Sequence, residues 1–425
     1  MTNPRPQGGT QAATVLQDDA VDLNTAGISA QEQREAQEKY PLSFLSLTGV
    51  TKTLVDWVVV AVAIWVLITA VSAIGSGFGI AVGDRAADIF QFAQNPFVGL
   101  MIGVLATVLT QSSSTTTSIT VGMVAGGLPI EIAIPVLFGA NIGTTVTSTL
   151  VSLGLSGDKV MFRRGFAAAS VHDMYNLIAA LIFFPLELLF APLQHSSAWL
   201  SEQLAGEGAG PVGVLFDGLG AAVSVVTEPG VTLLEWAVSP LGAVAGGVTL
   251  IVVGVLLILA VISFIGKMLK ALLVGTAQKM FHNAIGRGPL SGVASGTLVT
   301  VLVQSSSTTT SLAVPLAATG KFSLRQIFPF VVGANIGTTV TALIAAFGFS
   351  GAEGQVALQA AFVHLLYNVF AALLIMGVPG LRTLPIKAAS LLARLGTENK
   401  LYVIGWVAGI FLILPMLLIG ATMLS

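Results

Sequence analysis

Long apolar runs, separated by short polar segments, dominate the chain from residue 54 onward. Runs of about 20 apolar residues are long enough to cross the hydrocarbon core of a bilayer as helices. The pattern therefore predicts an all-α, polytopic membrane protein. The predicted spans are 54–74, 129–153, 165–190, 243–265, 324–348, 356–378 and 401–424.

Two further segments, 97–127 and 289–318, are apolar at both ends and polar in the middle. A single straight helix would place a glutamine and a row of hydroxyl groups at mid-membrane depth. A re-entrant hairpin is more economical, because its two half-helices meet at a polar tip that lines a wet cavity, where irregular backbone is tolerated. We therefore predict one hairpin in each segment.

Three strings in and around these segments occur twice. They are QSSSTTTS at 111–118 and 304–311, GANIGTTVT at 139–147 and 333–341, and VHDMYN at 171–176 with VHLLYN at 363–368. The copies are 193, 194 and 192 residues apart, so the whole unit is duplicated. We interpret it as two copies of one membrane-embedded binding element.

Composition supports the membrane assignment. The chain is 54% apolar and only 9% charged, with a mean hydropathy of +0.90, whereas soluble domains carry about 25% charged residues. The absence of cysteine excludes disulfides, thiol catalysis and cysteine-based metal sites, and the four scattered histidines argue against a zinc cluster. Residues 1–40 are polar and lack a signal-peptide pattern, which is typical of a disordered tail.

Lys and Arg gather in the loops 158–164, 266–288 and 380–400, whereas 191–240 contains neither. Because basic loops stay in the cytoplasm, this asymmetry predicts a cytoplasmic N-terminus and an extracytoplasmic C-terminus. The first copy then starts and ends outside and the second inside, so the copies are inverted, as in many secondary transporters. The predicted organisation is a first repeat over 54–190, an extracytoplasmic loop over 191–240, a linking helix over 243–265, a second inverted repeat over 289–380 and a final helix over 401–424.

The hairpin tips carry chemistry suited to an anion. Ser and Thr cap helix N-termini, where free backbone N–H groups carry partial positive charge and can hold an anion without Lys or Arg. The same hydroxyl and amide oxygens can coordinate Na⁺, a hard cation that prefers oxygen ligands. The alternative is that small hydroxyl residues only allow helices to pack closely.

The GANIGTTVT strings predict a broken helix in each repeat. Glycines and an Asn inside an apolar span weaken the helix and free carbonyl oxygens for ion coordination. Close helix packing through glycine is the alternative. The candidate sodium ligands in these strings are Asn141, Thr144, Thr145, Asn335, Thr338 and Thr341.

The third duplicated string breaks the symmetry, because Asp173 corresponds to Leu365 in the second copy. Asp173 and Asn176 are three residues apart and share a helix face, and Asn368 is the counterpart of Asn176. A carboxylate inside an apolar span is costly unless it is paired or functional, which favours one extra cation site. The alternatives are a carboxylate in cytoplasmic-side water, or one paired with Arg163 or Arg164.

The duplicated strings, with GDKVMFRRGFAAASVHDMYN at 157–176 and FPLE at 184–187, closely resemble the type II sodium–phosphate cotransporters. The resemblance covers residues 54 to 424 and implies uptake of inorganic phosphate driven by Na⁺. In that family the QSSS hairpins are taken to bind phosphate and sodium. The matching residues are Gln111, Ser112, Ser113, Ser114, Gln304, Ser305, Ser306 and Ser307.

The resemblance also implies which subtype this chain follows. Asp173 matches an aspartate that serves an extra sodium site in the electrogenic members, and Asp158 matches an aspartate near that site. Leu155 replaces a family glutamine, which is a departure at that site. The loop 191–240 lacks the cysteines and glycosylation sequons of animal members, which favours a bacterial protein of the inner (plasma) membrane.

We therefore expect inorganic phosphate, Na⁺ and the lipid bilayer as partners, no nucleic acid, and no cofactor other than Na⁺ as coupling ion. Two other classes remain open. A sodium-coupled carrier of another oxyanion could use the same neutral chemistry. A membrane hydrolase using a serine and His172 would need one site only, so duplication argues against an enzyme, and no G-x-S-x-G elbow is present.

Overall fold

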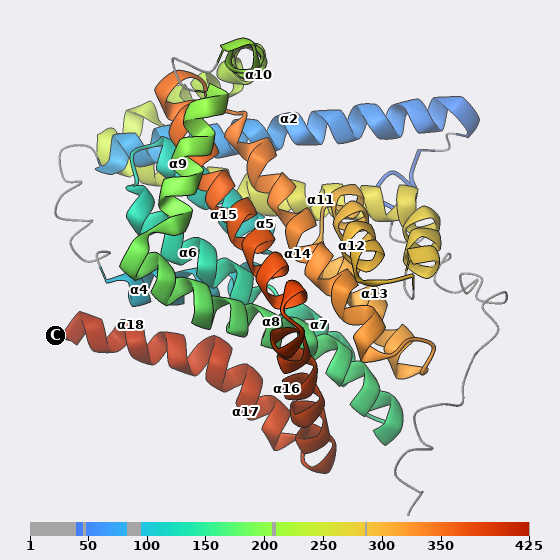
Figure 1. The fold of residues 1–425 in the computed structure, drawn as a ribbon. Helices are drawn as coiled ribbons and strands as arrows, with labels where there is room; N and C mark the ends of the chain where they lie inside the picture. The colour runs from blue at the N-terminus through green and yellow to red at the C-terminus, as the bar shows by residue number, and fades with distance from the viewer. Residues whose placement is uncertain (1–39, 46–47, 83–94, 206–209, 285–286, 425) are drawn as a thin grey trace, which may run out of the picture.

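A computed structural model describes residues 40–45, 48–82, 95–205, 210–284 and 287–424 (Figure 1). Within these ranges all regular structure is helical, which confirms the all-α prediction. By length and composition, eight of the described helices could cross a membrane. The tail predicted over 1–40 lies outside the described residues except for Tyr40.

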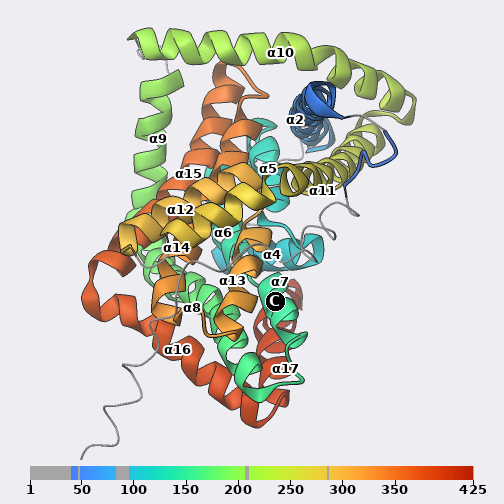
Figure 2. The ribbon, with the colours of Figure 1, turned by 90° about the vertical axis from the view of Figure 1, so that its right-hand side faces the viewer.

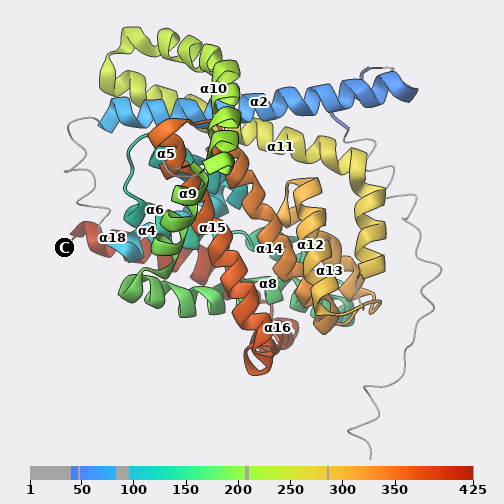
Figure 3. The ribbon, with the colours of Figure 1, turned by 45° about the horizontal axis from the view of Figure 1, so that its top comes forward.

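Each predicted span lies within apolar helices or extends at most two residues beyond their ends, and two of the spans are divided between consecutive helical segments. The helices are α2 (Gly49–Val82), α6 (Ile130–Gly143) with α7 (Val146–Leu153), α8 (Lys159–Phe190), α11 (Ala243–Ala284), α14 (Leu324–Ala346), α15 (Gly351–Gly377), and α17 (Leu401–Ala408) continued by η4 (Gly409–Ile413) and α18 (Leu414–Leu424). Helices α2 and α11 lie side by side along their length, as Figures 1 and 3 show.

Each predicted hairpin is a pair of short helices. The first pair is α4 (Pro96–Thr110) and α5 (Ser113–Ala125), and the second is α12 (Pro289–Val303) and α13 (Ser306–Ala318). At 1.5 Å per residue these helices are roughly 20 Å long, too short to cross a hydrocarbon core of ~30 Å. Each pair therefore turns back at a polar tip, where Gln111 is exposed and Gln304 is half-buried.

The second helix of each pair packs into the other repeat. Helix α5 contacts α14 and α15, whereas α13 contacts α7 and α8. Helices α14 and α15 are the sequence counterparts of α6–α7 and α8. Each hairpin therefore packs its second helix against equivalent helices of the opposite repeat. This exchange brings the polar residues of both repeats toward one region of the protein.

The structure corrects the prediction for the second GANIGTTVT string. The first copy is interrupted between α6 and α7 at Thr144 and Thr145, as predicted, but α14 runs through the second copy without a break. A Cβ added to Gly333 would lie 2.0 Å from the Val293 carbonyl oxygen on α12. A Cβ added to Gly139 of the interrupted copy would lie equally close (2.0 Å) to the Leu100 carbonyl oxygen on α4. The identical string therefore accommodates both forms, and tertiary context rather than helix propensity decides between them.

The segment between the repeats is also helical. It contains α9 (Pro192–Ala205), α10 (Gly210–Val238) and the short η3 (Ser239–Leu241). Figures 2 and 3 show α10 lying across the end of the helical bundle and over α2, where Trp65 donates to the Val226 carbonyl (3.0 Å). The stretch Gly218–Leu241, which includes most of α10 and all of η3, is among the eight candidate spans, yet only 6% of its most apolar 18 residues are buried. Finally, α16 (Pro379–Glu398) joins α15 to α17.

Candidate functional site

The two hairpin tips have the same backbone geometry. Gln111 ends α4 at φ 55° and ψ 23°, and Gln304 ends α12 at φ 54° and ψ 28°. Few residues other than glycine adopt this left-handed conformation, because their Cβ meets the backbone. A non-glycine residue held there twice marks a backbone that the surrounding structure fixes, as functional sites often require.

Each tip glutamine joins its hairpin to the neighbouring duplicated string. The Gln111 amide donates to the Val108 carbonyl (3.0 Å) and its Oε1 accepts from Thr147 (3.0 Å). The Gln304 Oε1 accepts from Thr341 in the same way (3.0 Å). Thr341, a predicted sodium ligand, therefore lies at the second tip. Thr147 lies at the matching place in the first repeat and was not among the predicted ligands.

The serines after each glutamine begin the second helix of the hairpin. Ser112 accepts a hydrogen bond from the Thr115 N–H (3.2 Å), and Ser305 accepts one from the Thr308 N–H (3.1 Å). Ser113, Ser114 and Ser306 are buried, while Ser307 is half-buried. Since the first N–H groups of a helix have no partner within the helix, both tips present N–H and hydroxyl donors to the protein interior.

Helix α7 connects the second hairpin to the first repeat. Ser148 lies 2.8 Å from Thr310 of α13, with both hydroxyls buried. One residue further, Thr149 is fully buried, and its hydroxyl makes no hydrogen bond within the described residues. The short helix thus presents one hydroxyl to the hairpin and another toward α8.

A chain of buried amides links the two repeats. His172 Nε2 lies 2.5 Å from Asn335 Oδ1, and the side-chain amide of Asn335 donates to Asn176 Oδ1 (2.5 Å). The side-chain amide of Asn176 in turn donates to the main-chain carbonyl of Asn141 (2.7 Å). Because Asn335 uses its NH₂ on Asn176, its oxygen faces His172, whose Nε2 must then donate. Four of the predicted polar positions are thereby in one network.

The counterpart of this network in the second repeat is not formed. Asn368 donates to the His364 carbonyl (2.9 Å), and the Asn141 amide donates to Leu137 in its own helix (3.3 Å). Both ring nitrogens of His364 are buried without a hydrogen-bond partner among the described residues. The same residue types therefore occupy two different local arrangements.

Asp173 on α8 is 1% exposed, and its polar neighbours come from α7, from the break before α7 and from α17. Its Oδ2 accepts a hydrogen bond from Trp406 Nε1 on α17 (3.1 Å). The Thr145 and Thr149 hydroxyls lie beside the carboxylate, but Oδ1 meets the geometry of a hydrogen bond with no group in the described chain. This pair of unpartnered oxygens, on Asp173 and Thr149, is suited to a cation that accepts oxygen ligands.

The arginines expected as an alternative partner are elsewhere. Asp173 forms no ion pair in the described residues. Arg163 and Arg164 are exposed and line a cavity of about 350 Å³ with the turn between α13 and α14 and with α16. Neither arginine therefore pairs with Asp173 in this structure.

Asp158 is separate from this cluster. It is exposed and caps α8, where its carboxylate accepts the Val160 and Met161 N–H groups (2.8 and 2.9 Å). These two backbone bonds, that from Met161 first, lower the pKa of the Asp158 carboxyl. Fifteen residues along one helix separate Asp158 from Asp173, roughly 22 Å, so the two carboxylates cannot hold the same ion in this conformation.

The threonines of the GANIGTTVT strings bond back to their own helices. Thr144 donates to Ala140 (3.0 Å), Thr338 to Ala334 (2.9 Å) and Thr145 to Ile142 (3.2 Å). A hydroxyl that donates its hydrogen to a carbonyl keeps its oxygen lone pairs for a cation. These residues remain compatible with the ligand role expected from the sequence.

Sequence reasoning missed two members of the Asp173 cluster. Thr149 carried no signal beyond its place after the GANIGTTVT string, although its spacing would put it near Asp173 if α7 packed on α8. Trp406 lies 233 residues from Asp173, in a helix interpreted only as a span. Sequence spacing cannot indicate such a long-range contact.

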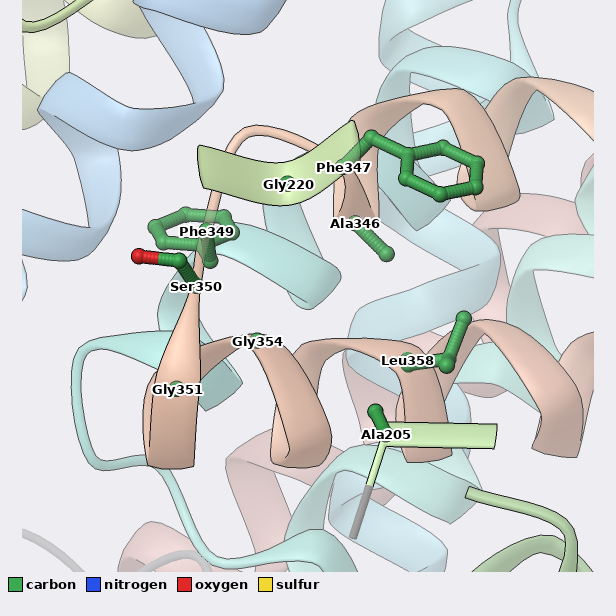
Figure 4. A pocket seen from close by; sticks show the side chains of 9 residues that line it. All are labelled: Ala205, Gly220, Ala346, Phe347, Phe349, Ser350, Gly351, Gly354 and Leu358. Atoms are coloured by element: carbon green, nitrogen blue, oxygen red, sulfur yellow. The ribbon is translucent and has the colours of Figure 1, made fainter. Parts of the chain in front are cut away.

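A small pocket of about 30 Å³ is lined by residues other than these polar ones. Its lining comes from the end of α14, the start of α15 and the helices between the repeats, and includes Phe347, Phe349, Leu358 and Gly220 (Figure 4). It holds about one water molecule by volume. Its lining contains no charged side chain and none of the duplicated QSSSTTTS residues.

Comparisons with known proteins point to one class. The family model described as Na⁺/Pi-cotransporter matches residues 66–219 and 256–381. The chain is 29% identical to sodium-dependent phosphate transport protein 2A of Rattus norvegicus, over 92% of this chain and 71% of the relative. It is 30% identical to the Mus musculus protein of the same name, over the same shares. It is 29% identical to sodium-dependent phosphate transport protein 2B of Bos taurus, over 87% of this chain and 65% of the relative. No solved structure matches the chain significantly.

Proposed function

The chain belongs to the Na⁺/Pi-cotransporter family, and from this premise we propose that it imports inorganic phosphate with Na⁺ in a cycle that carries net positive charge inward. Membership of a transporter family also removes the hydrolase alternative, so the protein is not an enzyme. The observation that carries the proposal is the hairpin tip built twice, each with a left-handed glutamine followed by a capping serine.

Phosphate binds at the tips in this proposal. The N-termini of α5 and α13 present backbone N–H groups, and partial positive charge at helix N-termini favours an anion. The hydroxyls and amides that surround them donate hydrogen bonds without a full positive charge. The phosphate-binding residues are Gln111, Ser112, Ser113, Ser114, Gln304, Ser305, Ser306 and Ser307.

Neutral donors cannot offset the two charges of HPO₄²⁻, so cations must accompany it. The buried oxygens near the tips meet this need, because Na⁺ prefers oxygen ligands. Asn141, Asn176 and Asn335 lie in one cross-repeat network, and Thr341 reaches the second tip. Na⁺ bound at these oxygens would contact both the phosphate site and the hydrogen bonds that join the two repeats.

A further Na⁺ binds at Asp173. The unpartnered Oδ1 and the Thr149 and Thr145 hydroxyls supply the oxygens, and a carboxylate strengthens cation binding where the dielectric constant is low. Two Na⁺ would neutralise HPO₄²⁻, and this third ion gives the cycle its net charge. Asp158, at the exposed start of α8, joins such a site only if transport moves the loop before α8 toward Asp173.

Transport alternates access to these sites between the two sides of the membrane. Inverted orientation of the repeats, cytoplasmic loops at 158–164, 266–288 and 380–400, and a location in the inner membrane belong to the same proposal. The charge asymmetry of the loops supports the orientation. The exchanged packing of α5 and α13 supports two bodies that meet at a shared site.

Uptake of labelled phosphate into proteoliposomes tests the function. We expect accumulation with a Na⁺ gradient and none when K⁺ or choline replaces Na⁺. Valinomycin-imposed potentials, negative inside, should increase uptake. Equal uptake in choline would overturn sodium coupling, and uptake indifferent to voltage would overturn the charge-carrying cycle. Competition by arsenate and sulfate tests the alternative of another oxyanion.

A further inference from the structure

Trp406 is the residue that α17 contributes to the polar interior. Its indole N–H donates to Asp173 Oδ2 at 3.1 Å, across 233 residues of sequence. Trp406 lies beyond residue 381, where the match to the family ends. The bond therefore brings a residue from outside the duplicated motifs to the carboxylate that distinguishes the two repeats.

The bond makes the two oxygens of Asp173 different. Trp406 donates to Oδ2, while Oδ1 has no hydrogen bond within the described residues, and the unpartnered hydroxyl of Thr149 lies beside the carboxylate. An indole N–H can only donate, so it cannot itself bind a cation. It is also neutral, so it fixes the carboxylate in place without cancelling its charge, as an arginine would.

The helix that carries Trp406 is anchored on both sides of it. Val403 is fully buried, 2.6 Å from where a Cβ on Gly396 of α16 would lie, and Phe411 in η4 is also fully buried. Figures 1 and 2 show α17 beginning beside the end of α16. The π-helical turn η4 follows directly, and such turns are frequent at functional sites.

We propose that Trp406 is a positioning residue for sodium coupling: it holds Asp173 Oδ2 so that Oδ1 faces Thr149 and receives Na⁺. This inference rests on the proposed function. The indole bond limits the rotation of the carboxylate, so the binding oxygens are arranged before the ion arrives. Preorganised ligands bind more tightly because less freedom is lost on binding.

The variant Trp406→Phe tests the role, because it keeps an aromatic ring and removes the donor. We expect the Na⁺ concentration for half-maximal phosphate uptake to rise about tenfold, equivalent to ~1.4 kcal/mol. Uptake at saturating Na⁺ should stay within about twofold of the unmodified protein, because the phosphate tips are untouched. Trp199→Phe is the matched control, since Trp199 is 61% exposed on α9.

A double-mutant cycle with Asp173→Asn separates positioning from general support of the fold. If Trp406 acts through the carboxylate, Trp406→Phe should have no further effect on the Na⁺ dependence in the Asp173→Asn background. An equal loss in both backgrounds would overturn the inference, as would an unchanged Na⁺ dependence in Trp406→Phe alone.

A measurement without transport gives a second readout. Na⁺ raises the unfolding temperature of a protein that binds it when folded, so the midpoint of that effect reports affinity in detergent. We expect the midpoint to move to higher Na⁺ in Trp406→Phe, and an unmoved midpoint contradicts the inference. Absence of sodium-dependent uptake by the unmodified protein would instead refute the proposed function, so the two failures are distinct.

Discussion

His172 on α8 and Asn335 on α14 are joined at 2.5 Å across the two repeats. Their sequence counterparts, His364 and Asn141, share no hydrogen bond within the described residues. Of the two equivalent His–Asn pairs, only His172 and Asn335 are therefore joined across the repeats. Such an asymmetry is expected when two copies of one element adopt different conformations in a single state of a transporter.

The first prediction compares the two histidines. His172→Leu leaves Asn335 Oδ1 buried and unpaired, which should lower the free energy of unfolding by ~1–3 kcal/mol. His364→Leu removes two unpartnered ring nitrogens and should be neutral or stabilising. Thermal unfolding of both variants in detergent shows which of them is less stable. A larger loss in His364→Leu than in His172→Leu would contradict the arrangement seen here.

The second prediction concerns the hairpin tips. Gln111→Ala and Gln304→Ala should each abolish phosphate uptake while membrane expression remains, because both tips contribute to one site. Gln111→Gly is the informative control, since glycine adopts the left-handed backbone at φ 55° without strain but lacks the amide. We expect it to be equally inactive. Uptake by the glycine variant would mean that the backbone, not the side chain, matters.

The tips illustrate what sequence can predict. A glutamine followed by a row of hydroxyls inside an apolar segment is unfavourable unless the chain turns there, so polarity alone located Gln111 and Gln304 at helix ends. Their shared contact to Thr147 and Thr341 also follows from duplication, once one copy is known. The local half of the site was therefore predictable.

The remaining features depend on packing between distant segments. Asn335 was expected in a broken helix, but α14 is continuous, although Gly139 of the interrupted copy packs on α4 as closely as Gly333 packs on α12. Trp406 reaches Asp173 only because α16 and α17 place it there. Neither result depends on a pattern within a single segment, so sequence spacing had no means of indicating it.

A third prediction tests glycine packing. A Cβ on Gly139 or Gly333 would lie 2.0 Å from a carbonyl oxygen of the hairpin helix it faces. Gly139→Ala and Gly333→Ala should each destabilise by ~1–3 kcal/mol, as overpacked sites do. Gly405→Ala is the control, because nothing lies within 4 Å of its Cβ position on α17, and alanine favours a helix. Thermal unfolding should separate the two classes.

The fourth prediction concerns α10 and the orientation of the chain. If α10 lies along the surface, positions 199 and 239, on either side of it, face the outside together, as the charge pattern of 191–240 predicts. Single cysteines at both positions of this cysteine-free chain should react with an impermeant maleimide in intact cells, whereas one at Ser390 on α16 should not. Labelling of only one of positions 199 and 239 would mean that α10 crosses the membrane.

The last prediction assigns the charge of the cycle to Asp173. Moving one charge through 100 mV is worth about 2.3 kcal/mol, which corresponds to roughly 50-fold in accumulation at ~1.4 kcal/mol per decade. Asp173 is buried, and its counterpart in the second repeat is Leu365. Asp173→Gly removes the carboxylate and leaves the tips and the amide network in place. We expect this variant to retain sodium-dependent phosphate uptake and to lose its response to valinomycin-imposed potentials. A variant that keeps the full voltage response would show that the third Na⁺ binds elsewhere, and the contact with Trp406 would then be a structural bond only.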